Sequence, residues 1–344
     1  MEQASAEHKL PLSAGDLVAR PHCPICGSPE RKHLRDIPYS DTASTHHLRC
    51  QACGLVYMDP VPSQDWYDRL YGEEFWEVKS VQQADAEVWS NERQWHKGLA
   101  RAEKYINLLR QAAPEASIKS VLEIGASFGL IGTAVADAYG ARAFGVEPNH
   151  AARAFAGRVS GMTMVAETAA GLETWQPDTP VDLAIFSHVL ENIIDLQSAL
   201  RNVHRKLKPR GLLLIETPNV DWQPSMSIYH PHCFSSQALE VVLAECGFRV
   251  RRTSRSGRPT SSLMPRYLTV LSESVAAPLP RRAPGGVVGT ETVRSRHSMY
   301  RKFYKSRFGG LDYKLSWMRF HRTPFIQRGI ASLRASLDRL KGKQ

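Results

Sequence analysis

The clearest pattern in the chain is an alternation of short apolar runs with helix-like stretches through its middle third. One apolar run begins near Ile118, ends in the glycine-rich turn of VLEIGASFG (residues 121–129), and precedes a helix-like segment, LIGTAVADAYG. A second run, RAFGVEPN, ends in Glu147. Such alternation predicts an α/β fold with a doubly wound, mostly parallel sheet. Ligands of these sheets lie at the carboxyl ends of the strands.

Two stretches with helical periodicity flank this middle part. In residues 82–113, apolar and aromatic side chains recur every three or four positions, which predicts a long amphipathic helix. They are Trp95, Leu99, Ala102, Tyr105, Ile106 and Leu109. Trp89 and Trp95 either face an acceptor or pack in the core, and packing is the favoured interpretation. A second predicted helix near the C-terminus has an apolar face formed by Ile326, Ile330, Leu333, Leu337 and Leu340.

Composition bounds the class of protein. A chain of 344 residues with 42% hydrophobic content is long enough for one α/β domain with smaller attachments. The first twenty residues have no sustained apolar core, and no run approaches the roughly 20 apolar residues of a membrane span. We therefore expect a cytoplasmic protein. The net charge of +10 is uneven: residues 275–344 hold 16 Lys/Arg and 3 Asp/Glu, and the rest holds 28 and 31.

Two cysteine pairs stand at the front of the chain. CPIC (residues 23–26) and CQAC (50–53) are each followed by a glycine that frees the turn. Paired thiolates two residues apart can face one metal, and two pairs complete a tetrahedral zinc site without an open position. The predicted ligands are Cys23, Cys26, Cys50 and Cys53, and the predicted zinc is structural. Disulfides are the less favoured alternative in a cytoplasmic chain.

The glycine-rich turn after the first strand does not fit the common phosphate sites. A dinucleotide fingerprint needs glycine where Ser127 and Leu130 stand, and a P-loop needs a lysine that is absent. Instead Glu123, Gly125 and Gly129 form an acid-x-Gly-x-x-x-Gly pattern. The acid suits a cationic ligand group, and Glu147, 22 residues beyond Gly125, suits a ribose diol. A ribose contact and an ammonium contact without a phosphate site indicate S-adenosylmethionine.

These residues resemble the class I S-adenosylmethionine-dependent methyltransferases over residues ~80–275. Further segments agree in order: VDLAIFSHVLENIID (181–195), LKPRGLLLIETPN (207–219), YHPHCFSSQALEVVLAECGF (229–248), and the final pair FRVRRTS and RYLTVLSE. The family usually has glycine at the position of Ser127. The resemblance implies a seven-stranded, Rossmann-like sheet. It also implies a cofactor cleft lined by Glu123, Gly125, Ser127, Gly129, Glu147, Pro148, Glu167, Thr168, Ser187 and His188.

Some of these roles have structural alternatives. Glu167 or Thr168 is expected near the adenine. Glu191 lies either beside the cofactor's methionine moiety or at a helix start, where an acid satisfies free N–H groups. The resulting domain organisation has an N-terminal arm at 1–19, a zinc ribbon at 20–60, a helical cover or linker at 61–117, the methyltransferase core at 118–273, and a basic linker with a helical tail at 274–344.

An alcohol acceptor must lose a proton, so a general base is expected. The candidates are His230 and His232 in YHPHCF, with His232 the preferred base; an ordinary loop role for either is the open alternative. The ribbon resembles that of bacterial methyltransferases of secondary-metabolite and polysaccharide pathways. In related sugar C-methyltransferases a glutamate stands where Pro231 lies, so O-methylation of a small molecule, sugar or glycolipid is favoured over N- or C-methylation.

The partners follow from the same features. A small-molecule, sugar or lipid-linked acceptor is expected. An RNA methyltransferase using the ribbon and the basic tail is the rival hypothesis, and a non-catalytic cofactor-binding subunit or scaffold is another. Residues 274–297 predict a linker. Two locations are open for the basic C-terminal helix. It lies on an anionic membrane surface, such as the inner membrane, or it docks on its own domain or on a second subunit; docking is favoured.

Overall fold

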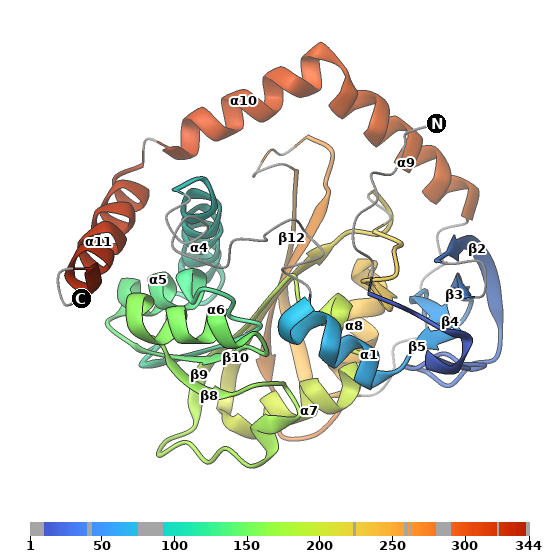
Figure 1. Cartoon of the computed structure of the whole chain (residues 1–344), viewed down its shortest axis with the longest axis horizontal. Helices are drawn as coiled ribbons and strands as arrows, with labels where there is room; N and C mark the ends of the chain where they lie inside the picture. Colours follow the sequence, from blue (N-terminus) through green and yellow to red (C-terminus); the bar gives the residue numbers. More distant parts are fainter. Residues whose placement is uncertain are drawn as a thin grey trace.

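The computed structural model describes residues 10–39, 43–74, 92–222, 225–257, 261, 263–279, 290–321 and 323–341. A seven-stranded sheet forms its centre (Figure 1), with the strand order β12-β13-β10-β9-β6-β7-β8. The bounds are β6 (Ser120–Ile124), β7 (Arg142–Val146), β8 (Thr163–Ala166), β9 (Val181–Ser187), β10 (Leu207–Pro218), β12 (Phe248–Ser256) and β13 (Tyr267–Ser274). β13 runs antiparallel to both neighbours, and the other pairs are parallel. The predicted doubly wound fold is confirmed.

Alternation along the central strands explains why both faces are covered. In β9, Leu183 and Ile185 belong to one hydrophobic cluster, whereas Ala184 and Phe186 belong to the other. Successive strand residues point to opposite faces, so a strand that is apolar throughout must be buried on both sides. The covering helices are α4 (Glu92–Ala112) and α5 (Leu130–Tyr139) on one face, and α7 (Leu196–Lys206) and α8 (Ser236–Glu245) on the other. The expected helix at 82–113 is therefore confirmed for 92–112, and residues 82–91, with Trp89, lie outside the described residues. Trp95 is buried, as favoured.

Local signals place the helix ends. The side chain of Asn149 accepts from Ala152 N–H at 2.8 Å at the start of α6 (His150–Phe155), and Asp195 accepts from Ser198 N–H at 3.0 Å at the start of α7. Such caps satisfy N–H groups that the first helical turn leaves free. Helix α5 ends at Gly140, whose left-handed φ of 62° closes the turn. The two N-caps fix where loops at the carboxyl edge of the sheet end, and Gly140 ends α5 before the chain enters β7.

The N-terminal part forms a second sheet beside the first. Its strand order is β11-β4-β3-β2, and the bounds are β2 (Arg31–Pro38), β3 (Ser44–Cys50), β4 (Val56–Asp59) and β11 (His232–Cys233). Before this sheet, β1 (Leu17–Val18) pairs with β5 (Val61–Pro62), which comes after β4 and is followed by helix α1 (Gln64–Arg69). The cysteines share a hydrophobic cluster with Leu190 and Phe234 of the large domain. The ribbon is thus packed on the domain and is not an independent module.

Three helices end the chain: α9 (Thr290–Lys305), α10 (Arg307–His321) and α11 (Pro324–Lys341). Helix α11 packs its apolar face on α4 and α5, where Ile326, Ile330 and Leu333 are buried with Leu99 and Leu130. The favoured docking of this helix on its own domain is confirmed. The linker predicted at 274–297 is wrong from Thr290 onward, because α9 starts there. None of the described helices is long and apolar enough to cross a membrane.

Candidate active site

The order of the strands fixes where a ligand can bind. From β6 the chain passes to β7 and β8 on one side, then returns to β9 on the other side of β6. The loops that leave the carboxyl ends of β6 and β9 therefore diverge. In an open α/β sheet this topological switch point is the ligand crevice. The residues that follow β6, β7 and β9 are thus the first candidates for contact with a ligand.

The turn after β6 has the backbone shape that its sequence predicts. Gly125 has a φ of 68°, and a Cβ there would lie 2.3 Å from Val189 Cγ2, so only glycine fits. Ser127 also lies in the left-handed region, with a φ of 49°, although it carries a side chain. Its N–H donates to Glu147 Oε2 at 2.7 Å. The turn is therefore folded back onto the end of β7.

Glu147 is held by backbone donors at the tip of β7. Its Oε2 accepts from Ser127 N–H and its Oε1 accepts from Asn149 N–H at 2.9 Å, across the bend at Pro148. Burial raises the pKa of this carboxyl, and the two N–H donors oppose the rise. A carboxylate offers about four lone-pair sites, so two stay available for hydroxyl donors. The geometry fits the diol contact predicted for Glu147.

Glu123 does not face the crevice. Its Oε2 accepts from Gly132 N–H at 2.7 Å, in the first turns of α5, and the side chain is buried. Burial raises its pKa to about 8. The cationic ligand group expected opposite Glu123 therefore has no access to this carboxyl in the structure. Glu191, in the short turn Leu190–Asn192 after β9, is a better acceptor: it is buried, and within the described part of the chain its Oε2 has no hydrogen-bond partner.

The two residues predicted near an adenine lie on the rim. Glu167 is exposed and pairs with Arg153 at 2.7 Å, and Thr168 Oγ1 accepts from Gly171 N–H at 3.3 Å. The main chain is closer to the crevice, because Ala166 O accepts from Glu147 N–H. The side chains of Glu167 and Thr168 do not contact Glu147 in the structure. Their contact with the adenine stays a prediction.

A buried charge network lies beside the crevice, at the carboxyl ends of β9 and β10. Its centre is Glu216, whose side chain is 1% exposed. The contacting groups come from three elements: Lys104 Nζ, Arg101 Nε at 3.3 Å, His188 Nε2 at 3.3 Å and Thr269 Oγ1 at 2.8 Å. Burial opposes ionisation, yet Lys104, His188 and Arg101 together hold the pKa of Glu216 well below its ordinary value. Glu216 is therefore a carboxylate surrounded by cations and donors.

Sequence reasoning missed this network. Its one local signal is the acid in the apolar run LLLIETP, near the end of a buried strand. Arg101 and Lys104 are separated by three residues on α4, so they share a helix face. The sequence does not show that this face meets β10.

His188 connects the network to the crevice. It directly follows β9 and has a φ of 60°. Its Nε2 faces Glu216, and its Nδ1 lies 3.4 Å from Glu191 Oε1. The ring also meets Tyr267 edge-on at 5.0 Å, while the preceding Ser187 Oγ bonds to Tyr105 Oη at 2.8 Å. His188 thus lies between two carboxylates, and its side chain is partly exposed.

Comparison with known proteins identifies the domain. Residues 95–253 match a family model described as a methyltransferase domain. This part of the chain is a class I S-adenosylmethionine-dependent methyltransferase domain. The family match and the seven-stranded sheet with one antiparallel strand agree on this point. No curated protein matches the chain.

Solved structures show distant likeness. An N-methyltransferase from Bradyrhizobium japonicum in complex with S-adenosyl-L-homocysteine is 17% identical, with a TM-score of 0.39, over 50% of this chain and 86% of that one. An amino pentose methyltransferase from Micromonospora echinaspora is 14% identical, with a TM-score of 0.40, over 53% and 92%. A methyltransferase from Archaeoglobus fulgidus is 19% identical, with a TM-score of 0.41, over 50% and 94%. At these scores the likenesses carry no argument about the acceptor.

The two histidines predicted as bases lie in the contact between the methyltransferase domain and the ribbon. His232 is in β11, which pairs with β4 of the ribbon, and it is fully buried with its Nε2 2.9 Å from Arg20 Nη1. Burial and the nearby Arg20 hold its pKa well below the ordinary value. A base must reach its acceptor, so the structure argues against His232. The main-chain oxygen of His230 accepts a hydrogen bond from His47 Nε2–H. The ring of His230 contacts the main chain too, with Nδ1 2.6 Å from Ser225 O.

The four cysteines of the ribbon are brought together. Their sulfur atoms lie within 4.8 Å of one another, with Cys23 Sγ 3.5 Å from Cys53 Sγ and Cys26 Sγ 3.5 Å from Cys50 Sγ. A disulfide needs about 2.05 Å, so these are thiols in this structure. Four sulfurs at about 2.3 Å from a central zinc would be separated by roughly 3.8 Å, which is close to the spacing found. The donor set fits zinc.

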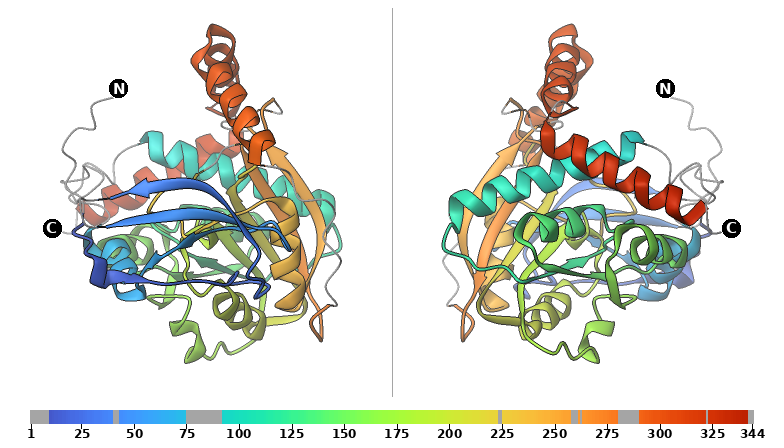
Figure 2. Two further views of the ribbon diagram at one scale, coloured as in Figure 1. Left: turned by 90° about the vertical axis from the view of Figure 1, so that its right-hand side faces the viewer. Right: turned by 90° about the vertical axis from the view of Figure 1, so that its left-hand side faces the viewer.

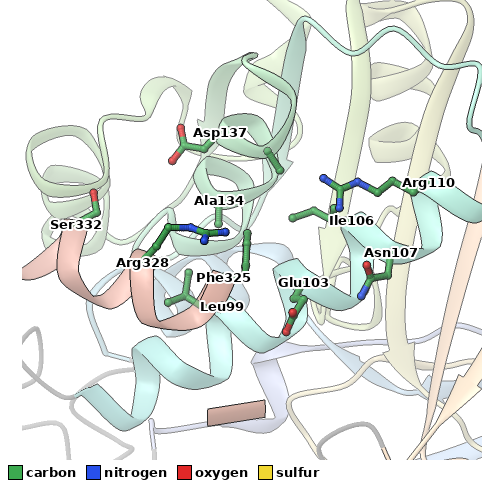
Figure 3. Close-up of a pocket in the computed structure, with 12 residues that line it drawn as sticks. Leu99, Glu103, Ile106, Asn107, Arg110, Ala134, Asp137, Phe325, Arg328 and Ser332 are labelled. Carbon is green, nitrogen blue, oxygen red and sulfur yellow. The ribbon is translucent and has the colours of Figure 1, made fainter. Parts of the chain in front are cut away.

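A cavity of about 420 Å³ lies away from the strand ends (Figure 3). Leu99 and Ile106 of α4, Ala134 of α5, and Phe325 and Arg328 of α11 line it. Helix α11 approaches α4 closely here, since a Cβ at Gly329 would lie 2.8 Å from Leu99 Cδ1. The cavity results from the docking of α11, and we assign it no part in methyl transfer.

Proposed function

We propose that the protein transfers a methyl group from S-adenosylmethionine to a hydroxyl oxygen of a small molecule, sugar or glycolipid. The observation that carries this proposal is the placement of His188 between Glu216 and Glu191, next to the predicted cofactor crevice. S-Adenosylmethionine, when bound, supplies an electrophilic methyl group. The residues of this chain then have to hold the cofactor, align the acceptor and remove one proton.

Glu147 and the turn 125–129 would hold the nucleoside, and Glu191 would face the cofactor's ammonium group. The support for the second contact is the buried, unpartnered Oε2 of Glu191 among the described residues. A buried carboxylate oxygen without a donor is costly, and a bound ammonium would supply the donor. The main-chain donors to Glu147 fix its orientation before any ligand arrives.

His188 would act as the base, in place of His230 and His232. With Nε2–H donating to Glu216, Nδ1 carries the lone pair that would take the acceptor's hydroxyl proton, at a position 3.4 Å from Glu191 Oε1. After this proton transfer, the two ring N–H groups would be donated to Glu191 Oε1 and Glu216 Oε1. A hydroxyl acceptor needs a base to remove its proton, whereas a neutral amine can attack without one. The position of His188 beside the crevice therefore favours an oxygen acceptor over a nitrogen acceptor.

We further propose that the cysteine cluster holds a structural zinc. Four thiolates leave no open coordination position, so the ion would contribute to folding and not to the transfer step. The cysteines lie in the same core as Leu190, which neighbours Glu191. The ion would thereby stabilise the side of the crevice where His188 lies.

The acceptor class can be tested by labelling. Purified protein is given methyl-labelled S-adenosylmethionine and a lysate of the source cells, and the products are separated into nucleic-acid, lipid, glycan and small-molecule fractions. Glu147→Ala serves as the blank and His188→Gln as the test of the base. Label in the lipid, glycan or small-molecule fraction that is lost in both variants supports the proposal. Label in RNA overturns the acceptor class, and full labelling by His188→Gln overturns the base.

A further inference from the structure

Helix α10 carries an apolar stripe on its outer surface. Its members are large apolar side chains, each between 52% and 61% exposed: Phe308, Leu311, Leu315 and Met318. Spacings of three, four and three residues place them on one face of the helix. Contiguous exposed apolar surface of this kind is uncommon on a folded protein and marks an interaction site.

Basic side chains flank this stripe. Five Lys and Arg side chains of α9 and α10 are exposed: Arg301, Lys302, Lys305, Arg307 and Lys314. Arg307 and Lys314 are seven residues apart, so they lie on the same edge of the stripe. Within the described part of the chain, none of the five pairs with a carboxylate. Asp312, the one acid of α10, is turned to the body, where it accepts from Ser261 Oγ at 2.9 Å.

The two helices are anchored to the body and yet stand away from the sheet. Arg266 Nη1 donates to Tyr300 Oη at 2.6 Å, which ties α9 to the start of β13. Figures 1 and 2 show α9 and α10 as an arc on the outside of the molecule, beyond the helices that cover the sheet. Helix α11, by contrast, has its apolar face buried against α4 and α5. The surface available to a partner is therefore that of α10.

We propose that α9 and α10 form an arm that binds an anionic lipid surface, with the stripe inserted at the level of the headgroups and the basic side chains on lipid phosphates. An exposed apolar stripe flanked by basic side chains suits such an interface, and each Lys or Arg near an anionic surface adds to the attraction. This inference concerns a surface separate from the methyl-transfer site and does not depend on the proposed acceptor.

Charge and side-chain chemistry favour lipid over two other occupants. A second copy of the chain would place its own basic arm or its nearly neutral body on this surface, and neither complements the positive charge. Single-stranded RNA is bound by basic grooves with aromatic platforms on which bases stack. Three of the four stripe residues are aliphatic or thioether side chains, which suit acyl chains and do not stack with bases.

The experiment is flotation of the full-length, zinc-loaded protein with vesicles of neutral phosphatidylcholine or of phosphatidylcholine with about 30% phosphatidylglycerol. Binding is expected for the anionic vesicles and is expected to weaken with salt. Leu311→Gln/Leu315→Gln should reduce the partition coefficient by at least about thirtyfold, because two apolar side chains no longer enter the interface. Arg307→Gln/Lys314→Gln should reduce it by roughly thirtyfold in low salt and less in high salt.

Val18→Gln is the matched control, since Val18 is also an exposed apolar residue but lies in β1, near the N-terminus. All substituted side chains are exposed, so the melting temperature should stay unchanged, and S-adenosylhomocysteine affinity reports an intact core. No binding to anionic vesicles, or binding that Leu311→Gln/Leu315→Gln leaves unchanged, would overturn the proposal. The proposal would also be overturned if the same double variant kept vesicle binding but abolished dimer formation in light scattering, or abolished RNA binding.

Discussion

The proposed cofactor side and the proposed acceptor side of the crevice are built in different ways. On the cofactor side, the turn 125–129 and Glu147 come from adjacent strands and are joined by one hydrogen bond across 20 residues. On the acceptor side, Glu216 gathers groups from α4, the end of β9 and β13. The first is a local arrangement in which the main chain provides the donors. The second exists only when four distant segments pack together.

Loss of the proposed zinc should have the largest effect, because the hydrophobic core that holds the cysteines also contains Leu190, next to Glu191. Zinc sites of this type contribute on the order of 10 kcal/mol to folding. We expect about one zinc per chain, and a fall in melting temperature of about 10 °C or more after dialysis against a strong chelator. Mass spectrometry for metal content and differential scanning calorimetry measure this. Cys246→Ala, a buried cysteine outside the cluster, is the control and should keep the zinc; an unchanged melting temperature without metal would contradict the account.

Glu147→Gln tests the cofactor side. The amide keeps the size but loses the charge and turns donor groups toward Ser127 N–H or Asn149 N–H. Charged hydrogen bonds contribute about 1.5–3 kcal/mol each, so affinity for S-adenosylhomocysteine should fall by about a hundredfold. Isothermal titration calorimetry measures the affinity, and the exposed Glu173→Gln is the control. Affinity within threefold of the wild type would remove Glu147 from the cofactor site.

Glu123→Gln should give a smaller effect that depends on pH. The folded state raises the pKa of Glu123 to about 8, so it favours the protonated form. Stability of the wild type therefore falls as pH rises from about 4.5, where the unfolded carboxyl ionises, to about 8. Glutamine has no such titration and can still accept from Gly132 N–H. The variant's melting temperature should rise relative to the wild type between pH 5 and 8 and level off above that. A constant offset across this range would show that Glu123 is already ionised when folded.

The same contrast explains what the sequence could predict. The turn at Gly125 and the position of Glu147 at a strand end could be predicted because strand ends, glycine conformation and chain spacing are local properties. The cysteine pairs were found for the same reason, and the apolar face of α11 followed from its period. All of these signals lie within about 30 residues of sequence.

The remaining features depend on tertiary packing. His230 and His232 were predicted as bases from the chemistry of histidine. Nothing in YHPHCF indicates that β11 pairs with β4, some 175 residues earlier, and takes the ring of His232 into the interior. Similarly, the sequence shows Glu216 only as an acid in a predicted strand and Lys104 only as a polar residue on a predicted helix. Only the docking of α4 on the sheet makes them one network.

The most direct test compares His188→Gln with Glu147→Gln in two assays, S-adenosylhomocysteine affinity and methyl transfer into the labelled lysate fraction. The division of the crevice predicts that His188→Gln binds S-adenosylhomocysteine within about threefold of the wild type but loses at least about a hundredfold in transfer rate. It predicts that Glu147→Gln loses affinity. If His188→Gln weakens S-adenosylhomocysteine as strongly as Glu147→Gln does, His188 belongs to the cofactor side and the division is wrong.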